Sequence, residues 1–172
     1  MGGTVEIKGS GEGNQIDVGG TLEVGESLKL YGTLEVGGTV EIGNEVSAEN
    51  IEVGGVLHAK KVLAEDLVEV GGSIKTVEGT LARFVEIGKR GEVRGSIRAE
   101  QVNIGKGASA EDIFGKRILL RSGAQAENLY GESIIIESNC QINGEIQYTS
   151  ELRIGDNVSL AKKPQKVDKI TY

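Results

Sequence analysis

The sequence predicts a β-solenoid, and three observations predict it. A motif of two apolar residues flanking one polar residue returns every 17 positions, as in Ile51-Glu52-Val53, Val68-Glu69-Val70 and Val85-Glu86-Ile87. Apolar and polar residues alternate within each copy, as they do in a strand with one buried face. A unit of this length is too short for a helix pair and cannot bury its own apolar face. Each copy must therefore stack on its neighbours.

Each 17-residue unit predicts three short strands. Its apolar positions lie five or six residues apart, and glycine or polar residues separate them. Three strands of about five residues with a corner after each describe one triangular turn of a single-stranded parallel β-helix. From Val5 to Val158 the chain spans 153 residues, which predicts about nine turns of 17 residues.

The spacing also bears on the handedness of the helix. In the first segment the apolar residues are six apart, which suits the 18-residue turn of a left-handed hexapeptide-repeat helix: Leu22, Leu28, Leu34, Val40 and Val46. From Ile51 onward steps of five intrude, and the turn shortens to 16 or 17 residues. The loss of strict sixes over two-thirds of the chain favours the right-handed form.

Two sequence features predict the corners between strands. The chain has 27 glycines and a single proline, and the glycines lie at regular points between apolar pairs. We expect these glycines to be corners that require a positive φ. A second signature, Ala-Glu-(Asn/Asp/Gln)-apolar, recurs, as in Ala48-Glu49-Asn50-Ile51 and Ala110-Glu111-Asp112-Ile113. It predicts a corner with a small inward alanine and exposed polar residues that bond the neighbouring backbone.

Composition limits the core and the classes of partner. Aromatic residues make up 3% of the chain and Trp is absent, so Val, Ile, Leu and Ala must fill a narrow interior. The net charge is −7, and residues 1–57 hold 10 acids and only 2 bases. In a rod this first third is an acidic end. Because the sequence shows no basic stripe to neutralise phosphates, we do not expect a nucleic-acid partner.

The sequence indicates a soluble, cytoplasmic protein. A single cysteine excludes an internal disulfide framework and fits a reducing compartment. The N-terminal residues have neither a basic region nor an apolar stretch of the kind that marks a secretory signal. No run approaches the ~20 apolar residues of a membrane span. We therefore do not expect a membrane partner.

The boundaries of the domain follow from the repeat. The uninterrupted repeat predicts one β-helix domain over residues 1–161. The only proline, Pro164, stands in a segment that breaks the repeat, so residues 162–172 are predicted to form a short C-terminal tail.

One stretch resembles the repeat of a known family. Residues 93–108 follow the pattern V-x-G-x-I-x-A-x-x-V-x-I-G-x-G-A, and residues 142–146 and 152–155 repeat part of it. This pattern is similar to the usual turn of bactofilins, polymer-forming cytoskeletal proteins with a right-handed β-helical core, and the resemblance covers about residues 36–158. It implies self-assembly through the ends of the helix. Many members carry disordered flanking tails or a membrane-targeting N-terminus, whereas this chain is nearly all core.

The candidate catalytic residues are few. His58 is the only histidine, so a three-histidine zinc site of the hexapeptide-repeat type cannot form, and its position beside the inward Leu57 predicts that it points outward. Cys140 has no histidine within sequence reach to form a thiolate pair, and it is in phase with the inward Ile142. We predict no catalytic residue, no metal site and no cofactor.

A column of acids is predicted on the outer surface. Glu35, Glu52, Glu69 and Glu86 are 17 apart, so their side chains should point outward at the interstrand spacing. Such a stripe could bind divalent cations. The favoured interpretation is a solvated stripe whose carboxylates pair with Lys or Arg in adjacent columns and prevent lateral aggregation of the sheet.

These observations predict a non-enzymatic structural scaffold, of cytoskeletal type, that self-assembles through its terminal turns into filaments or oligomers. The predicted self-association residues of the N-terminal turn are Val5, Ile7, Ile16 and Val18, and those of the C-terminal turn are Leu152, Ile154, Val158 and Leu160. Open ends carry unpaired backbone groups over an apolar core, which makes them templates for strand addition. Two alternatives remain: a hexapeptide-repeat-like transferase acting at a subunit interface, and a passive module that binds other proteins on its flat faces.

Overall fold

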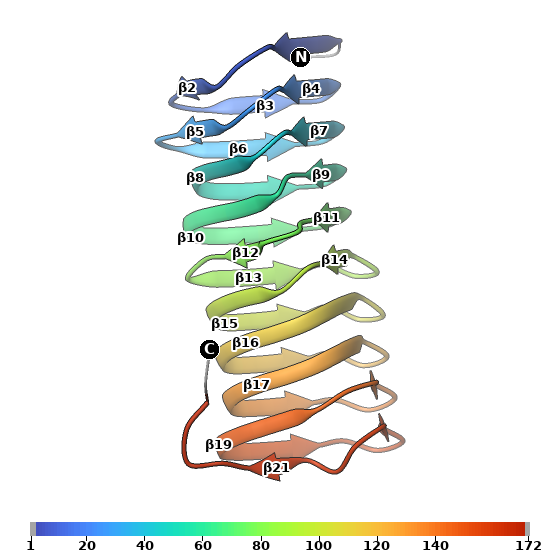
Figure 1. Cartoon of the computed structure of the whole chain (residues 1–172). Helices are drawn as coiled ribbons and strands as arrows, with labels where there is room; N and C mark the ends of the chain where they lie inside the picture. Colours follow the sequence, from blue (N-terminus) through green and yellow to red (C-terminus); the bar gives the residue numbers. More distant parts are fainter. Residues whose placement is uncertain (1–2, 171–172) are drawn as a thin grey trace.

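The computed structural model describes residues 3–170, in which the chain coils into a rod of stacked three-sided turns (Figure 1). All its strands belong to one continuous sheet whose registered pairs are parallel, and this range contains no helix. In Figure 1 the nearer strands run to the left and the fainter, more distant strands run to the right as the chain descends. This course is that of a right-handed coil. The predicted β-solenoid is confirmed.

Three faces run along the rod, and we name them A, B and C in the order in which the chain reaches them. Face A consists of β1 (Thr4–Ile7), β4 (Thr21–Val24), β7 (Thr39–Ile42), β9 (Val56–His58), β11 (Ser73–Lys75), β14 (Glu92–Arg94), the first residues of β16 (Ser109–Leu120) and β17 (Gln125–Ile136), β18 (Gln141–Ile142) and β20 (Ser159–Leu160).

Several strands continue around a corner and contribute to more than one face. Face B consists of β2 (Gly11–Gly13), β5 (Leu28–Leu30), the first parts of β8 (Glu45–Val53) and β10 (Lys61–Val70), β12 (Gly79–Leu81), the first part of β15 (Ile97–Ile104), the middles of β16 and β17, the first part of β19 (Ile146–Ile154), and β21 (Gln165–Lys166). Face C consists of β3 (Ile16–Val18), β6 (Thr33–Val36), β13 (Phe84–Ile87) and the last parts of β8, β10, β15, β16, β17 and β19.

The length of a turn varies along the rod. Thr4 pairs with Thr21 and Thr21 with Thr39, which are 17 and 18 positions apart. The turn from Ser73 to its partner Glu92 has 19 residues, and later turns have as few as 16. Within residues 3–170, faces A and B each hold ten strands, which corresponds to about ten turns. The sequence predicted about nine turns because the distance from Val5 to Val158 was divided by 17. That division counts the intervals between successive turns, and ten turns are separated by nine intervals.

The core is a stack of inward-pointing aliphatic side chains. On face A, Leu22, Val40, Leu57 and Ile74 follow one another in register, and each is at most 1% exposed. Full burial of such a side chain contributes about 1.5–3 kcal/mol, so the stack stabilises the rod along its whole length. Because successive side chains of a strand alternate, the residues beside this column point to solvent.

The corner between faces C and A has two designs. In the early turns it is a pair of glycines without positive φ, and a Cβ on Gly38, Gly55 or Gly72 would overlap the carbonyl oxygen of the glycine one turn before. The predicted need for positive φ is wrong at these glycines: the close stacking of successive corners excludes a side chain. From the fifth turn onward one residue of the corner does have positive φ, as at Gly107 and Gly123.

The Ala-Glu signature marks two different corners. Ala48 closes face B before face C, whereas Ala110 and Ala126 close face A before face B. At the second corner Asn128 donates to Asp112 (2.7 Å), and its side-chain oxygen accepts from the backbone N–H of Glu145 (2.7 Å). The signature therefore forms the predicted polar corner, in which side chains bond the neighbouring turn.

The segment after Ala161 continues the coil as far as β21, which pairs with β19 on face B. Lys162 forms an ion pair with Glu145 (2.9 Å), and the backbone N–H of Val167 donates to the carbonyl of Tyr148 (2.9 Å). Beyond β21 the chain turns back along the side of the rod (Figure 1), where Ile170 is buried. The last two residues of the predicted tail, 171–172, lie outside the described residues.

Candidate functional site

The N-terminal end of the rod exposes part of the apolar core. Strands β1, β2 and β3 each pair with a strand on one side only, so their outer edges are unpaired within residues 3–170. Val5 is 45% exposed, whereas Leu22, the next residue of the same inward column, is 1% exposed. The structure therefore brings an open sheet edge and uncovered aliphatic side chains together at this end.

A hollow of about 280 Å³ lies at this end, and all four residues predicted for the N-terminal joint line it. Of these, Ile7 and Ile16 are half-buried and Val18 is buried. Gly11 and Gly13 occupy the inward positions of β2 that Leu28 and Leu30 occupy one turn later. The first turn therefore contributes no side chain to the core from face B.

The C-terminal end is open on two of its three faces. Ile154 is 43% exposed, whereas Ile136, which precedes it in the same inward column, is 1% exposed. Leu152, Val158 and Leu160 are half-buried. On face B, strand β21 covers the edge of β19. The four predicted residues therefore lie together beside faces C and A, with the tail along the third side.

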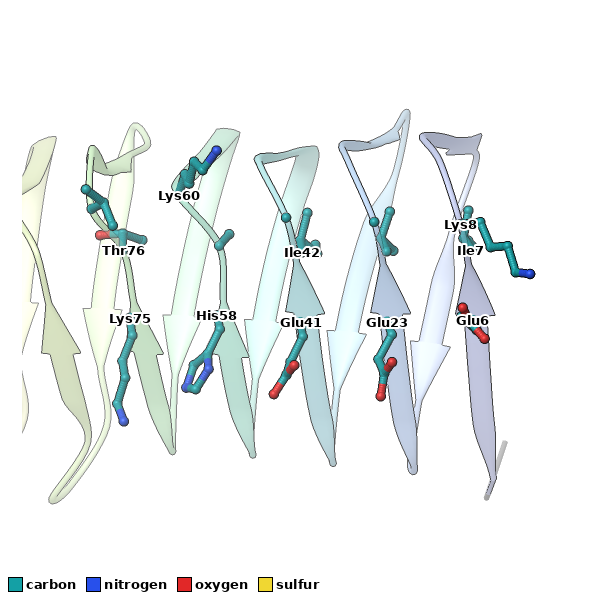
Figure 2. Close-up of a pocket in the computed structure, with 15 residues that line it drawn as sticks. Glu6, Ile7, Lys8, Glu23, Glu41, Ile42, His58, Lys60, Lys75 and Thr76 are labelled. Carbon is teal, nitrogen blue, oxygen red and sulfur yellow. The ribbon is translucent and has the colours of Figure 1, made fainter.

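His58 points outward, as predicted, within a column of charged side chains on face A. Glu41 precedes it and Lys75 follows it in register. Figure 2 shows these three side chains in one row with Glu23 and Glu6. His58 is half-buried, and its Nε2 atom is buried without a hydrogen-bond partner. The column borders a trough of about 660 Å³ whose lining includes Gly25 and Gly43.

Cys140 lies inside the rod, as predicted. It is 1% exposed and follows the buried Ala108 and Ala124 at the same corner of successive turns. Its Sγ atom lies 3.2 Å from the carbonyl oxygen of Arg121. Burial raises the pKa of the thiol, so the reactive thiolate is disfavoured. The arrangement suits a packing role.

The acidic stripe on face C forms in the predicted register and starts one turn earlier, at Asp17. The members Glu35, Glu52, Glu69 and Glu86 point to solvent in consecutive turns. The expectation that these carboxylates pair with Lys or Arg is wrong, because the ion pairs of residues 3–170 involve other acids. The carboxylates of this stripe therefore repel one another, and no ion pair with Lys or Arg within residues 3–170 offsets the repulsion.

Within residues 3–170, no three side chains of His, Cys, Asp or Glu are arranged to hold a metal ion. The same range contains no helix long and apolar enough to cross a membrane.

Comparisons with protein-family models, with curated proteins and with solved structures found no match. The functional interpretation therefore depends on the geometry of this chain. Sequence reasoning identified both ends, but it missed the charged column on face A. The recurring triplets Thr4-Val5-Glu6, Thr21-Leu22-Glu23 and Thr39-Val40-Glu41 are the signal that could have revealed it.

Proposed function

We propose that this protein is a non-enzymatic structural scaffold that assembles with copies of itself through its terminal turns into filaments or oligomers. The observation that carries the proposal is the exposure of core residues at both ends. Val5 and Ile154 are 45% and 43% exposed, while the residues next to them in the same columns are 1% exposed. Contact between two ends would complete the burial that each column begins.

Unpaired strand edges add a second favourable contribution. The outer edges of β1 and β3 at one end, and of β20 and the last part of β19 at the other, present backbone N–H and C=O groups that a further strand can pair with. The resemblance to bactofilins supports the same mode of assembly. The single cysteine fits a reducing compartment, and we assign the scaffold to the cytoplasm on that ground.

Charge distinguishes the two ends as joints. The outward residues of the first strands, Glu6, Glu12 and Asp17, are all acidic, so two N-terminal ends repel each other. At the other end Arg153 forms an ion pair with Glu151 (2.6 Å), so the outward charges of the last part of β19 largely cancel. The C-terminal joint should therefore be the tighter one. Added salt should strengthen the N-terminal joint, because it screens repulsion beyond about 8 Å at physiological strength.

The test is assembly measured by light scattering and electron microscopy as the protein concentration rises. Ile154→Arg places a charge at the C-terminal joint, so this variant should stay folded and stop elongating. Ile135→Arg is the matched control, because Ile135 points outward on face C one turn earlier and is 36% exposed. It should assemble like the unmodified chain. If the unmodified chain stays monomeric at high concentration in moderate salt, the proposal is wrong and the tail acts as a cap.

A further inference from the structure

The outward column on face A changes sign along the rod. In strand register its first six members are Glu6, Glu23, Glu41, His58, Lys75 and Arg94, and Glu111 and Glu127 follow in the next turns. Three carboxylates precede His58 and two cations follow it, and consecutive members lie about 4.8 Å apart, the interstrand spacing. The column is therefore acidic over the three turns before His58 and basic over the two turns after it.

This order of charges is complementary to itself. Consider a second copy packed face to face and antiparallel, related by a two-fold axis that crosses face A at His58, in the plane of the interface. Each column then faces the same column of the second copy in reverse order. Glu41 faces Lys75 of the second copy, and Glu23 faces Arg94 of the second copy. The symmetry repeats both contacts, which gives four pairs of opposite charges, whereas Glu6 faces Glu111 of the second copy as a like charge at each outer limit of the contact.

The neighbouring outward column allows the two faces to approach closely. From the turn of Glu23 to the turn of Lys75 it consists of small side chains, Thr21, Thr39, Val56 and Ser73, and Glu92 follows beside Arg94. All four small side chains are half-buried already, so this part of face A is flat. On the two-fold axis Val56 meets its own equivalent, which places an apolar contact at the centre of the interface with charge pairs beside it.

The charged groups at the centre of this surface are available for a partner. Within residues 3–170, the ion pairs leave out Glu23, Glu41 and Lys75. Arg94 uses its Nε atom to bond Glu92 (2.6 Å), and its two terminal nitrogens are outside that contact. The trough of about 660 Å³ beside Glu23, Glu41, His58 and Lys75 gives space for side chains of a second copy (Figure 2).

Faces B and C lack this property. On face C the column runs from acids through Asn103 to Leu119 and Ile135, so its reversal brings carboxylates onto aliphatic side chains. On face B the outward column has Leu63 and Leu81 at its middle. Its cations lie too far apart along the rod to face consecutive carboxylates of a reversed second copy. Of these outward columns, the one on face A brings opposite charges together when it is reversed about its centre.

We propose that two copies of this chain pack antiparallel through face A, around a two-fold axis at His58. The contact joins the sides of two rods and does not involve their ends, so it is independent of the end-to-end assembly. It would tie rods laterally in opposite directions.

The test reverses single charges in a chain whose C-terminal joint is blocked by Ile154→Arg, at low salt, where repulsion between the acidic ends opposes the N-terminal joint. In that background Glu41→Lys faces a lysine and Lys75→Glu faces a glutamate. Each substitution converts two attractive contacts into two repulsive ones, so each should raise the dimer dissociation constant at least about tenfold. An equimolar mixture of the two variants should form heterodimers, because opposite charges then face each other at positions 41 and 75. The double variant should dimerise again by itself.

Glu52→Lys is the matched control, since Glu52 is an equally outward glutamate in the turn before His58, on face C. It should leave the dimer unchanged in sedimentation equilibrium and native mass spectrometry. The proposal is wrong if the Ile154→Arg chain is monomeric, or if its dimer withstands Glu41→Lys. It is also wrong if the mixture and the double variant fail to recover dimers. The two proposals can be distinguished in chains that keep Ile154. If Glu41→Lys abolishes the face A dimer but such a chain still elongates, the proposed end-to-end assembly is unaffected.

Discussion

The rings of Phe114 and Tyr130 stack on the outer surface of face B, with their centroids 4.7 Å apart and their planes 11° from parallel. The strand register places them side by side in consecutive turns. The guanidinium of Arg98, one turn before, lies 4.9 Å from the centre of the Phe114 ring. Three side chains that are far apart in the sequence therefore form one continuous ladder, and the ladder links three turns of the rod.

The first prediction concerns the strength of this ladder. Stacked aromatic pairs contribute about 0.5–1.5 kcal/mol beyond the area that they bury. A double-mutant cycle with Phe114→Ala and Tyr130→Ala, followed by thermal or urea unfolding, should give a coupling energy of about that size. Tyr130→Phe keeps the ring and should retain most of the coupling. Additive single effects would show that the two rings do not stabilise each other.

A second prediction tests the direction of the side chains in β15. Ile104 is 0% exposed and pairs with Ile87, whereas the adjacent Asn103 points outward beneath Glu86. Ile104→Asp should bury a charge without a partner and cost several kcal/mol, about the penalty expected for an uncompensated polar group in a core. Asn103→Asp extends the acidic stripe and should cost under about 1 kcal/mol. Equal losses of melting temperature in the two variants would contradict the observed register.

The sequence predicted the alternation well because alternation is local. Two residues on either side suffice to place Ile104 inward and Asn103 outward. The charged column on face A depends instead on the sum of the turn lengths. A fixed step of 17 from Glu23 ends on the buried Val40, whereas the 18-residue turn brings Glu41 into line. The recurring Thr-apolar-Glu triplets align the first three members of the column, but the alignment of His58, Lys75 and Arg94 depends on corner lengths that only the structure gives.

The role of the glycines could not be predicted for a related reason. A sequence shows where glycine recurs, and positive φ is the usual local cause. At Gly55 the cause is the backbone of the preceding turn, which lies 17 residues back in the chain and next to it in space. Only the stacked structure reveals that contact. The pairing of the tail with β19 could not be predicted for the same reason, because it depends on where the last corner places β21 in space.

The third prediction uses two adjacent glycines that differ in this contact. A Cβ on Gly55 would overlap the carbonyl oxygen of Gly38, whereas a Cβ on Gly54 would lie 3.5 Å from the nearest atom, the carbonyl oxygen of Val36. Gly55→Ala must displace backbone in a packed corner, and overpacking of this kind costs about 1–3 kcal/mol or more. Gly54→Ala should stay within about 0.5 kcal/mol of the parent protein, as most surface changes do. Chemical unfolding of both variants measures the difference.

The last prediction concerns the pH dependence of the contact that fastens the tail. The ammonium group of Lys162 bonds Glu145 at a distance of 2.9 Å, and this bond lowers the pKa of the Glu145 carboxyl below its ordinary value of 4.5. A depressed pKa in the folded state stabilises the protein above the ordinary value, and the contribution disappears as the pH falls through the folded-state pKa. NMR titration should show the Glu145 pKa rising in a Lys162→Ala variant, while Lys163→Ala should leave it unchanged because Lys163 does not take part in the bond. An unchanged Glu145 titration in the Lys162→Ala variant would show that the tail is not held by this ion pair.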